Sequence, residues 1–87
     1  METVYKYPLG MPNDDITIEM HEGAEILYIE VQHGIPCLWA RVNTNKPIER
    51  KHFRMAGTGH PLNNAGKHIG SFLMEEGKLV FHLFEPF

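Results

Sequence analysis

The chain has 87 residues, of which 43% are hydrophobic, and a formal charge of −3 from 8 Lys and Arg against 11 Asp and Glu. This length predicts a single domain, residues 1–87, that buries about 60–65% of the surface of the unfolded chain. The acidic balance argues against duplex nucleic acid or an anionic membrane as a partner, because both require a basic face. One cysteine, Cys37, excludes an internal disulfide, and no secretory leader or long apolar run is visible. These features predict a cytoplasmic protein.

Apolar and polar residues alternate with a period of two through most of the chain, which is typical of half-buried strands. We expect strands, in chain order, over 4–7, 16–20, 26–32, 37–42, 49–55, 69–74 and 79–85, with irregular chain over 10–15 and 62–67. In the third strand, Leu27, Ile29 and Val31 are expected on the buried face. The last strand is apolar on both sides, which predicts a central strand covered on both faces. The fold class is therefore all-β, a small antiparallel sandwich or partly open barrel of about seven short strands.

The segment that most suggests a function follows the fifth strand. Arg54 lies in that strand, and Gly57, Thr58, Gly59 and His60 come after it. Glycines permit positive φ angles, which can turn successive N–H groups toward an anion, and the Arg54 fork suits phosphate or carboxylate. The spacing matches neither a Walker A loop nor a dinucleotide fingerprint. The segment is therefore either a nest for an anionic ligand or a structural turn whose polar side chains cap backbone groups.

A second candidate surface combines Trp39, Arg41 and His52. If strands 37–42 and 49–55 form a hairpin, these three residues share one face of the sheet. An aromatic ring beside a guanidinium can stack on a planar base or contact a partner protein. The alternative is that Trp39 lies in the core.

Catalytic signatures are missing from the sequence. The chain has six histidines, but none is paired at the two-to-four-residue spacing of zinc ligands, so neither a metal nor a cofactor is expected. The four histidines between 52 and 82 can still converge after folding, which keeps a small metal-dependent enzyme as a weaker alternative. Ser71 is the only serine, and it lies in a strand without a nucleophile motif. These residues favour a protein that is not an enzyme.

A family resemblance rests on segments 6–9, 16–20, 31–40, 53–54, 57–61, 69–70 and 80–82, of which Pro-Cys-Leu-Trp-Ala and Gly-Thr-Gly-His-Pro are the most specific parts. These segments resemble a family of small uncharacterised proteins of bacteriophages and of bacteria that carry prophages. The resemblance implies a phage accessory protein made in the host cytoplasm, with no catalytic residues to carry over. Analogy with small phage proteins suggests a role against host defence.

Together these observations predict a non-enzymatic binding protein that sequesters a small anionic, nucleotide-like signalling molecule. The alternative is an inhibitor that binds a host defence enzyme through an apolar and aromatic patch. Apolar sheet edges also favour a homo-oligomer.

Overall fold

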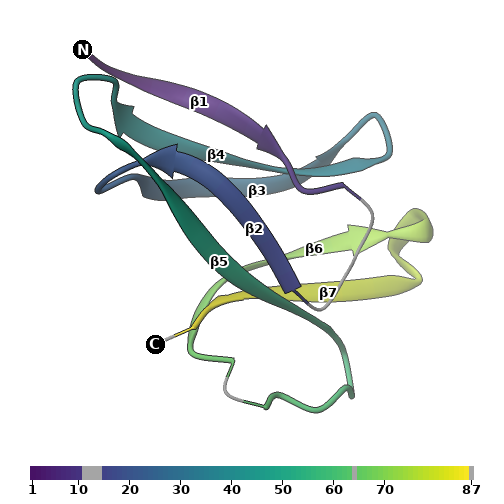
Figure 1. The fold of residues 1–87 in the computed structure, drawn as a ribbon. Coiled ribbons are helices and arrows are strands. Elements are labelled where there is room, and N and C mark those ends of the chain that lie inside the picture. Colours follow the sequence, from purple (N-terminus) through teal and green to yellow (C-terminus); the bar gives the residue numbers. More distant parts are fainter. Residues whose placement is uncertain (11–14, 64, 87) are drawn as a thin grey trace.

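Seven antiparallel strands form two sheets in the computed structural model, which describes residues 1–10, 15–63 and 65–86 (Figure 1). The sequence predicts irregular chain over 10–15 and 62–67. Residues 11–14 of the first segment and Asn64 of the second lie outside the described residues. Each expected strand is present, and all but the last are one to three residues longer than expected. Their bounds are β1 Glu2–Pro8, β2 Asp15–His21, β3 Glu25–Gln32, β4 Ile35–Asn43, β5 Ile48–Gly57, β6 Lys67–Met74 and β7 Leu79–Glu85.

The smaller sheet has the order β1-β4-β3. A two-residue turn joins β3 to β4, and both of its residues have positive φ, 51° at His33 and 77° at Gly34. This backbone matches the twist of a tight hairpin. Because β1 also pairs with β4, the middle strand has a hydrogen-bonded neighbour on each side.

The larger sheet has the order β2-β5-β7-β6, and β5 connects its two halves. Residues 48–54 of β5 pair with β2, whereas residues 54–57 pair with β7. Arg54 is thus the position where β5 passes from one neighbour to the other, and it lies between Asp15 of β2 and Phe84 of β7 in the register.

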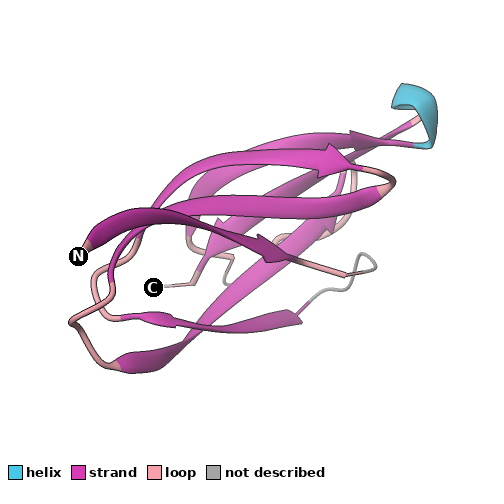
Figure 2. Ribbon diagram, turned by 90° about the horizontal axis from the view of Figure 1, so that it is seen from above, coloured by secondary structure: helices cyan, strands magenta, loops and turns pink. Residues whose placement is uncertain are grey.

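The core lies between the two sheets, and most strands extend along the molecule in Figure 2, whereas β2 and β5 cross the other strands obliquely in Figure 1. Leu38, Ala40 and Val42 of β4 face it, as the alternation in the sequence predicts, and Phe53 and Met55 of β5 face them from the other sheet. Four core side chains have no exposed surface at all: Met20, Leu38, Ala40 and Leu83. Full burial of a side chain as large as leucine or methionine stabilises the folded protein by about 1.5–3 kcal/mol.

The prediction that Leu27 lies on the buried face of β3 is wrong. A β-bulge shifts the register between Ile26 and Tyr28, so Leu27 is the extra residue and is 48% exposed. Ile26 takes its place against the core, together with Ile29 and Val31. A bulge inserts one residue into the alternation, so a strict period of two gives the wrong face on one side of it.

The expected position of β7 is only half correct. It is central, with β5 and β6 as neighbours, and Leu83 on its inner face is fully buried. Its outer residues Val80, His82 and Phe84 are half-buried, so the strand is not covered on both faces. Within the described residues the one helical element is the 3-10 turn Glu75–Gly77 between β6 and β7, and no helix there is long enough to cross a membrane.

Candidate functional site

The loop after β5 is a tight backbone turn at its start. Gly57 still belongs to β5 and pairs with Phe81, and the His60 N–H donates to the Gly57 carbonyl at 3.0 Å. The Thr58 N–H donates to the Val80 carbonyl at 3.1 Å. Two of the N–H groups that a nest would turn toward an anion are therefore used inside the protein. The turn itself fits the structural interpretation of this loop, and an anion would rely mainly on side chains.

The two glycines of the loop have different roles. Gly59 has a φ of 87°, which explains a glycine at that position. Gly57 lies in extended backbone, but a Cβ there would sit 3.0 Å from Cε1 of His60. Gly57 thus makes room for the imidazole ring, which folds back over the end of the strand.

Arg54 makes two contacts that tie the loop to the sheet. Its Nε lies 2.7 Å from Oδ1 of Asp15 on β2, and its Nη1 donates to the Asn63 carbonyl at 3.0 Å. A guanidinium has five N–H donors, so these contacts occupy only part of its capacity. The side chain is 40% exposed and stays accessible to a ligand.

Arg54 lies at a pocket of about 240 Å³ on the outer face of the larger sheet. We call this cavity the Arg54 pocket. It is lined by Arg54, Met55, Ala56, His60, Pro61, Leu62, Asn63, Ala65 and Phe84. The loop thus encloses space over β5 and β7, and the cavity combines a cation, an imidazole and an aromatic ring.

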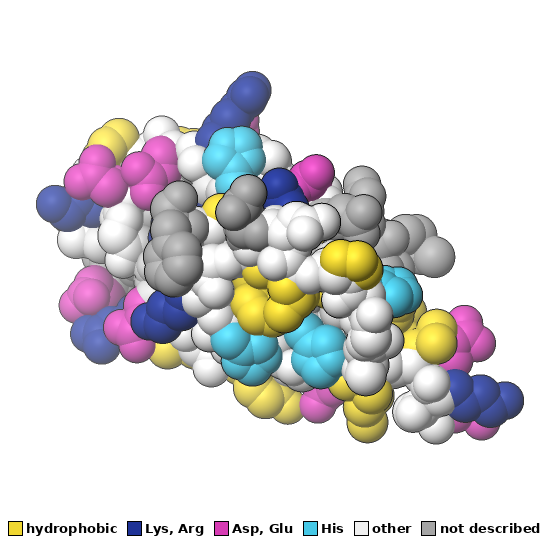
Figure 3. Space-filling model, turned by 90° about the horizontal axis from the view of Figure 1, so that it is seen from below, with side chains coloured by type: hydrophobic (Ala, Val, Ile, Leu, Met, Phe, Trp, Pro, Cys, Tyr) yellow, Lys and Arg dark blue, Asp and Glu magenta, His cyan; other side chains and the backbone are white. Residues whose placement is uncertain are grey.

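Four side chains beside this pocket form a continuous line of hydrogen bonds, which we call the histidine row: Thr58, His82, Ser71 and His68. His82 bonds Thr58 Oγ1 through Nε2 (2.9 Å) and Ser71 Oγ through Nδ1 (2.7 Å), and His68 Nε2 lies 3.1 Å from the same Ser71 oxygen. The His68 ring also meets the edge of Phe84, a wall of the pocket, with centroids 5.4 Å apart. Figure 3 looks at this face and shows histidines next to hydrophobic side chains near its middle.

The sequence did not predict that these four side chains form a row, although it allows the pairing of Ser71 with His82 to be predicted. Counting outward from the turn at 75–78 pairs Ser71 with His82, as the register has it. The same count gives the wrong partner for His68, because a bulge shifts the register between His68 and Gly70. Of the four histidines that were expected to be able to converge, His68 and His82 lie together, with ring centroids 6.4 Å apart. In the described part of the chain no three His, Cys, Asp or Glu side chains come close enough to hold a metal ion.

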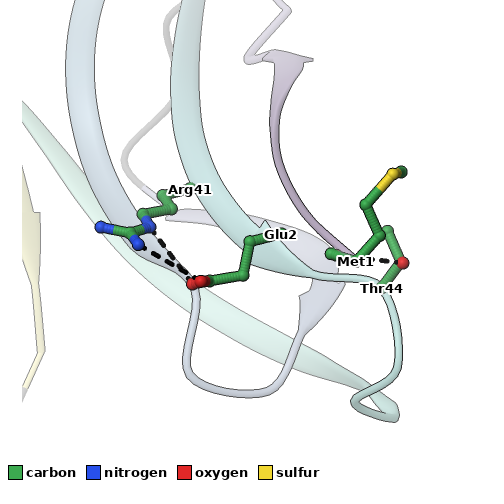
Figure 4. Close-up of polar contacts among 4 residues, drawn as sticks. All are labelled: Met1, Glu2, Arg41 and Thr44. Atoms are coloured by element: carbon green, nitrogen blue, oxygen red, sulfur yellow. Dashed lines mark hydrogen bonds and ion pairs between the residues drawn. The ribbon is translucent and has the colours of Figure 1, made fainter.

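The second predicted surface is wrong as a unit. Trp39 and Arg41 lie on β4 in the smaller sheet, whereas His52 lies on β5 in the larger one and bonds Thr17 Oγ1 at 3.0 Å. The strands 37–42 and 49–55 do not form a hairpin, because the turn between them carries the chain from one sheet to the other. Arg41 instead pairs with Glu2 of β1 through two contacts, at 3.2 and 3.3 Å (Figure 4).

Trp39 is on the outer face of the smaller sheet and not in the core. It is half-buried there against Tyr28 of β3, with ring centroids 5.7 Å apart. Tyr28 is 55% exposed and donates to Glu30 at 2.9 Å; this bond, together with the charge of Glu30, raises the pKa of Tyr28 above its usual value. Val4 on the same face is 52% exposed. We call Val4, Tyr28 and Trp39 the aromatic face.

A comparison with protein families matches residues 1–87 to the domain of unknown function DUF7352. The chain belongs to the DUF7352 family. The expectation of a family of uncharacterised proteins that spans the chain is thereby confirmed at this level, and the match carries no statement on a phage origin. No curated protein and no solved structure matches the chain. The features of this DUF7352 domain that bear on its function are the Arg54 pocket, the histidine row and the aromatic face.

Proposed function

We propose that the protein binds a small anionic ligand with a planar ring, such as a nucleotide, in the Arg54 pocket, and sequesters it without chemical change. The observation that carries this proposal is the position of Arg54, a partly exposed cation in the wall of a pocket that also contains the rings of His60 and Phe84. On a chain of net charge −3, such a site would attract an anion locally.

The size of the pocket limits the ligand class. Pockets that enclose drug-sized molecules measure roughly 300–1,000 Å³, and the Arg54 pocket is smaller, at about 240 Å³. It suits a single base or a mononucleotide better than both halves of a dinucleotide. Phe84 would stack on the ring, and the unused N–H groups of Arg54 would bind the phosphate.

The biological setting is part of the same proposal. Sequestration requires affinity and stoichiometric amounts, and it requires neither an acid nor a base. We infer a phage accessory protein that acts in the host cytoplasm and removes a nucleotide signal of host defence. Its sequence resemblance to small phage proteins is the support for this setting.

Isothermal titration calorimetry against nucleoside monophosphates, cyclic mononucleotides and cyclic dinucleotides tests the proposal. We expect a mononucleotide to bind, Arg54→Ala to abolish the heat and Arg50→Ala to leave it unchanged. Arg50 is the matched control because it lies on the same strand, with its Nε 3.9 Å from Glu19 Oε1, and away from the pocket. Binding by none of the three classes of nucleotide, or equal binding by Arg54→Ala, would overturn the proposal. Chromatography of the ligand after long incubation should return it intact.

The aromatic face supports a second candidate, an inhibitor that binds a host protein. Val4 adds exposed apolar surface to the packed rings of Tyr28 and Trp39 on one sheet, and aromatic residues are enriched at the centres of protein interfaces. A partner retained from host lysate in equimolar amount would support this function if Tyr28→Lys releases it and Arg54→Ala does not. Retention by the Tyr28→Lys variant would count against the aromatic face.

A further inference from the structure

The hydrogen bonds of the histidine row admit a direction of proton donation that starts at Thr58. The Thr58 hydroxyl can donate to the Val80 carbonyl at 3.4 Å, and Thr58 Oγ1 then accepts from Nε2 of His82 at 2.9 Å. With a proton on Nε2, a neutral His82 has an unprotonated Nδ1, and the Ser71 hydroxyl donates to it.

This arrangement gives Ser71 the partners of an activated nucleophile. An imidazole that accepts the hydroxyl proton is what a serine needs for attack at neutral pH, and a third group must hold the base in orientation. His82 is the base, and Thr58 holds its far nitrogen. Ser71 itself is exposed at the surface of the sheet, so an incoming molecule can reach it.

We propose that Ser71 is a nucleophile that accepts acyl groups from activated carboxylic esters. Ser71 Oγ attacks the ester carbonyl carbon and its proton moves to His82 Nδ1. The carbon–oxygen bond to the leaving alcohol then breaks, and that alcohol takes the proton from His82. Water, deprotonated by His82, attacks the acyl-serine, and the carboxylic acid and free Ser71 result. This activity goes beyond the proposed sequestration and does not depend on it.

Neighbouring side chains indicate which acyl group fits. Leu73 and Val80 pair across β6 and β7, two residues from Ser71 and His82 on the same outer face. Leu73 is 57% exposed and Val80 is half-buried, so they present apolar surface directly beside the serine. This surface suits a short apolar acyl group. The His68 N–H loses its bond to Ser71 when that oxygen attacks, so it becomes available for the oxyanion that forms next to it.

Incubation with p-nitrophenyl acetate tests the proposal by two readouts, release of p-nitrophenolate and the site of acetylation by peptide mass spectrometry. We expect an acetyl group on Ser71, no label at this position in Ser71→Ala, and acetylation slower by roughly 100-fold in His82→Gln. Ser71→Cys keeps the size of the side chain and should carry the acetyl group as a thioester. Thr58→Val should slow acetylation, and Thr58→Ser, which keeps the hydroxyl, should restore it.

A matched control separates this activity from the general reactivity of imidazoles toward such esters. Thr17 and His52 form a Thr–His pair on the same sheet, at 3.0 Å. His52→Gln should leave the labelling of Ser71 unchanged. Equal p-nitrophenolate release by the original protein and Ser71→Ala, or label confined to lysines, histidines and the N-terminus, would overturn the proposal. Nucleotide binding by Ser71→Ala is expected to be retained, so failure of this proposal leaves the sequestration proposal intact.

Discussion

Asp15 and Arg54 face each other across β2 and β5, with Oδ1 of the carboxylate 2.7 Å from Nε of the guanidinium. The carboxylate is 77% exposed, so the pair lies in high dielectric and stabilises the fold by at most about 1 kcal/mol. Its main effect is on the ligand site, because Asp15 places a negative charge beside Arg54, the one Lys or Arg among the described residues that line the Arg54 pocket.

Removal of the Asp15 charge should therefore tighten the binding of an anion. We expect Asp15→Asn to lower the Kd for a mononucleotide several-fold, because repulsion of the phosphate is lost and Arg54 gains free donors. The free energy of unfolding should change by less than about 1 kcal/mol. Calorimetry and urea unfolding of the same sample measure both quantities. Glu19→Asn, which removes the carboxylate beside Arg50, is the control and should leave the affinity unchanged.

The seven strands could be predicted because alternation reports directly which side chains meet apolar surroundings. The assignment of strands to sheets could not. Asn43 to Pro47 looks like a hairpin turn, yet it crosses between the sheets and is fixed by contacts with distant chain, such as the Glu22 N–H to the Pro47 carbonyl at 2.8 Å. A short polar connection has the same composition whether it closes a hairpin or crosses from one sheet to the other.

The candidate site was predictable in its residue types and not in its hydrogen bonds. Arg54 and His60 do line one pocket, as their closeness in the sequence suggests. The partner of the Thr58 N–H, the Val80 carbonyl, lies 22 residues away, and no local pattern indicates that it uses this donor. Trp39 shows the same limit, because both faces of β4 are apolar enough to serve as the inner one.

The bulge in β3 predicts unequal effects of two leucine substitutions. Leu38 is fully buried, and Leu38→Ala should destabilise the protein by about 2–5 kcal/mol. Leu27→Ala should cost less than about 1 kcal/mol, because Leu27 is 48% exposed and about half of its surface is already in water. Urea unfolding followed by tryptophan fluorescence compares them. A large loss for Leu27→Ala would place that residue in the core and contradict the bulge.

Gly66 predicts a steric requirement separate from its backbone angle. Its φ is 92°, and a Cβ there would overlap the Glu85 carbonyl oxygen and lie 2.6 Å from the Cα of Pro86. Gly66→Ala should destabilise the fold by about 3 kcal/mol or more, through strain and overpacking together. Gly23 also has a positive φ, 78°, but open space around it, so Gly23→Ala should cost only about 1 kcal/mol. Equal thermal unfolding temperatures for the two variants would argue against the close approach of Gly66 to the end of β7.

The contacts of Tyr28 on the aromatic face predict that its phenol ionises at a higher pH than a free tyrosine. Its hydrogen bond to Glu30 and the charge of that carboxylate both favour the neutral phenol, and they raise its pKa above 10.0. Because folding raises this pKa, the stabilisation is complete below pH 10.0 and is lost as the pH rises through the higher value of the folded protein. Ultraviolet absorbance of tyrosinate during a pH titration follows the ionisation. Glu30→Gln should move the Tyr28 component of the titration to lower pH, and Tyr28→Phe should remove that component. The pKa of Tyr7 is raised by burial and by Tyr5, so the Tyr7 component should stay unchanged in both variants.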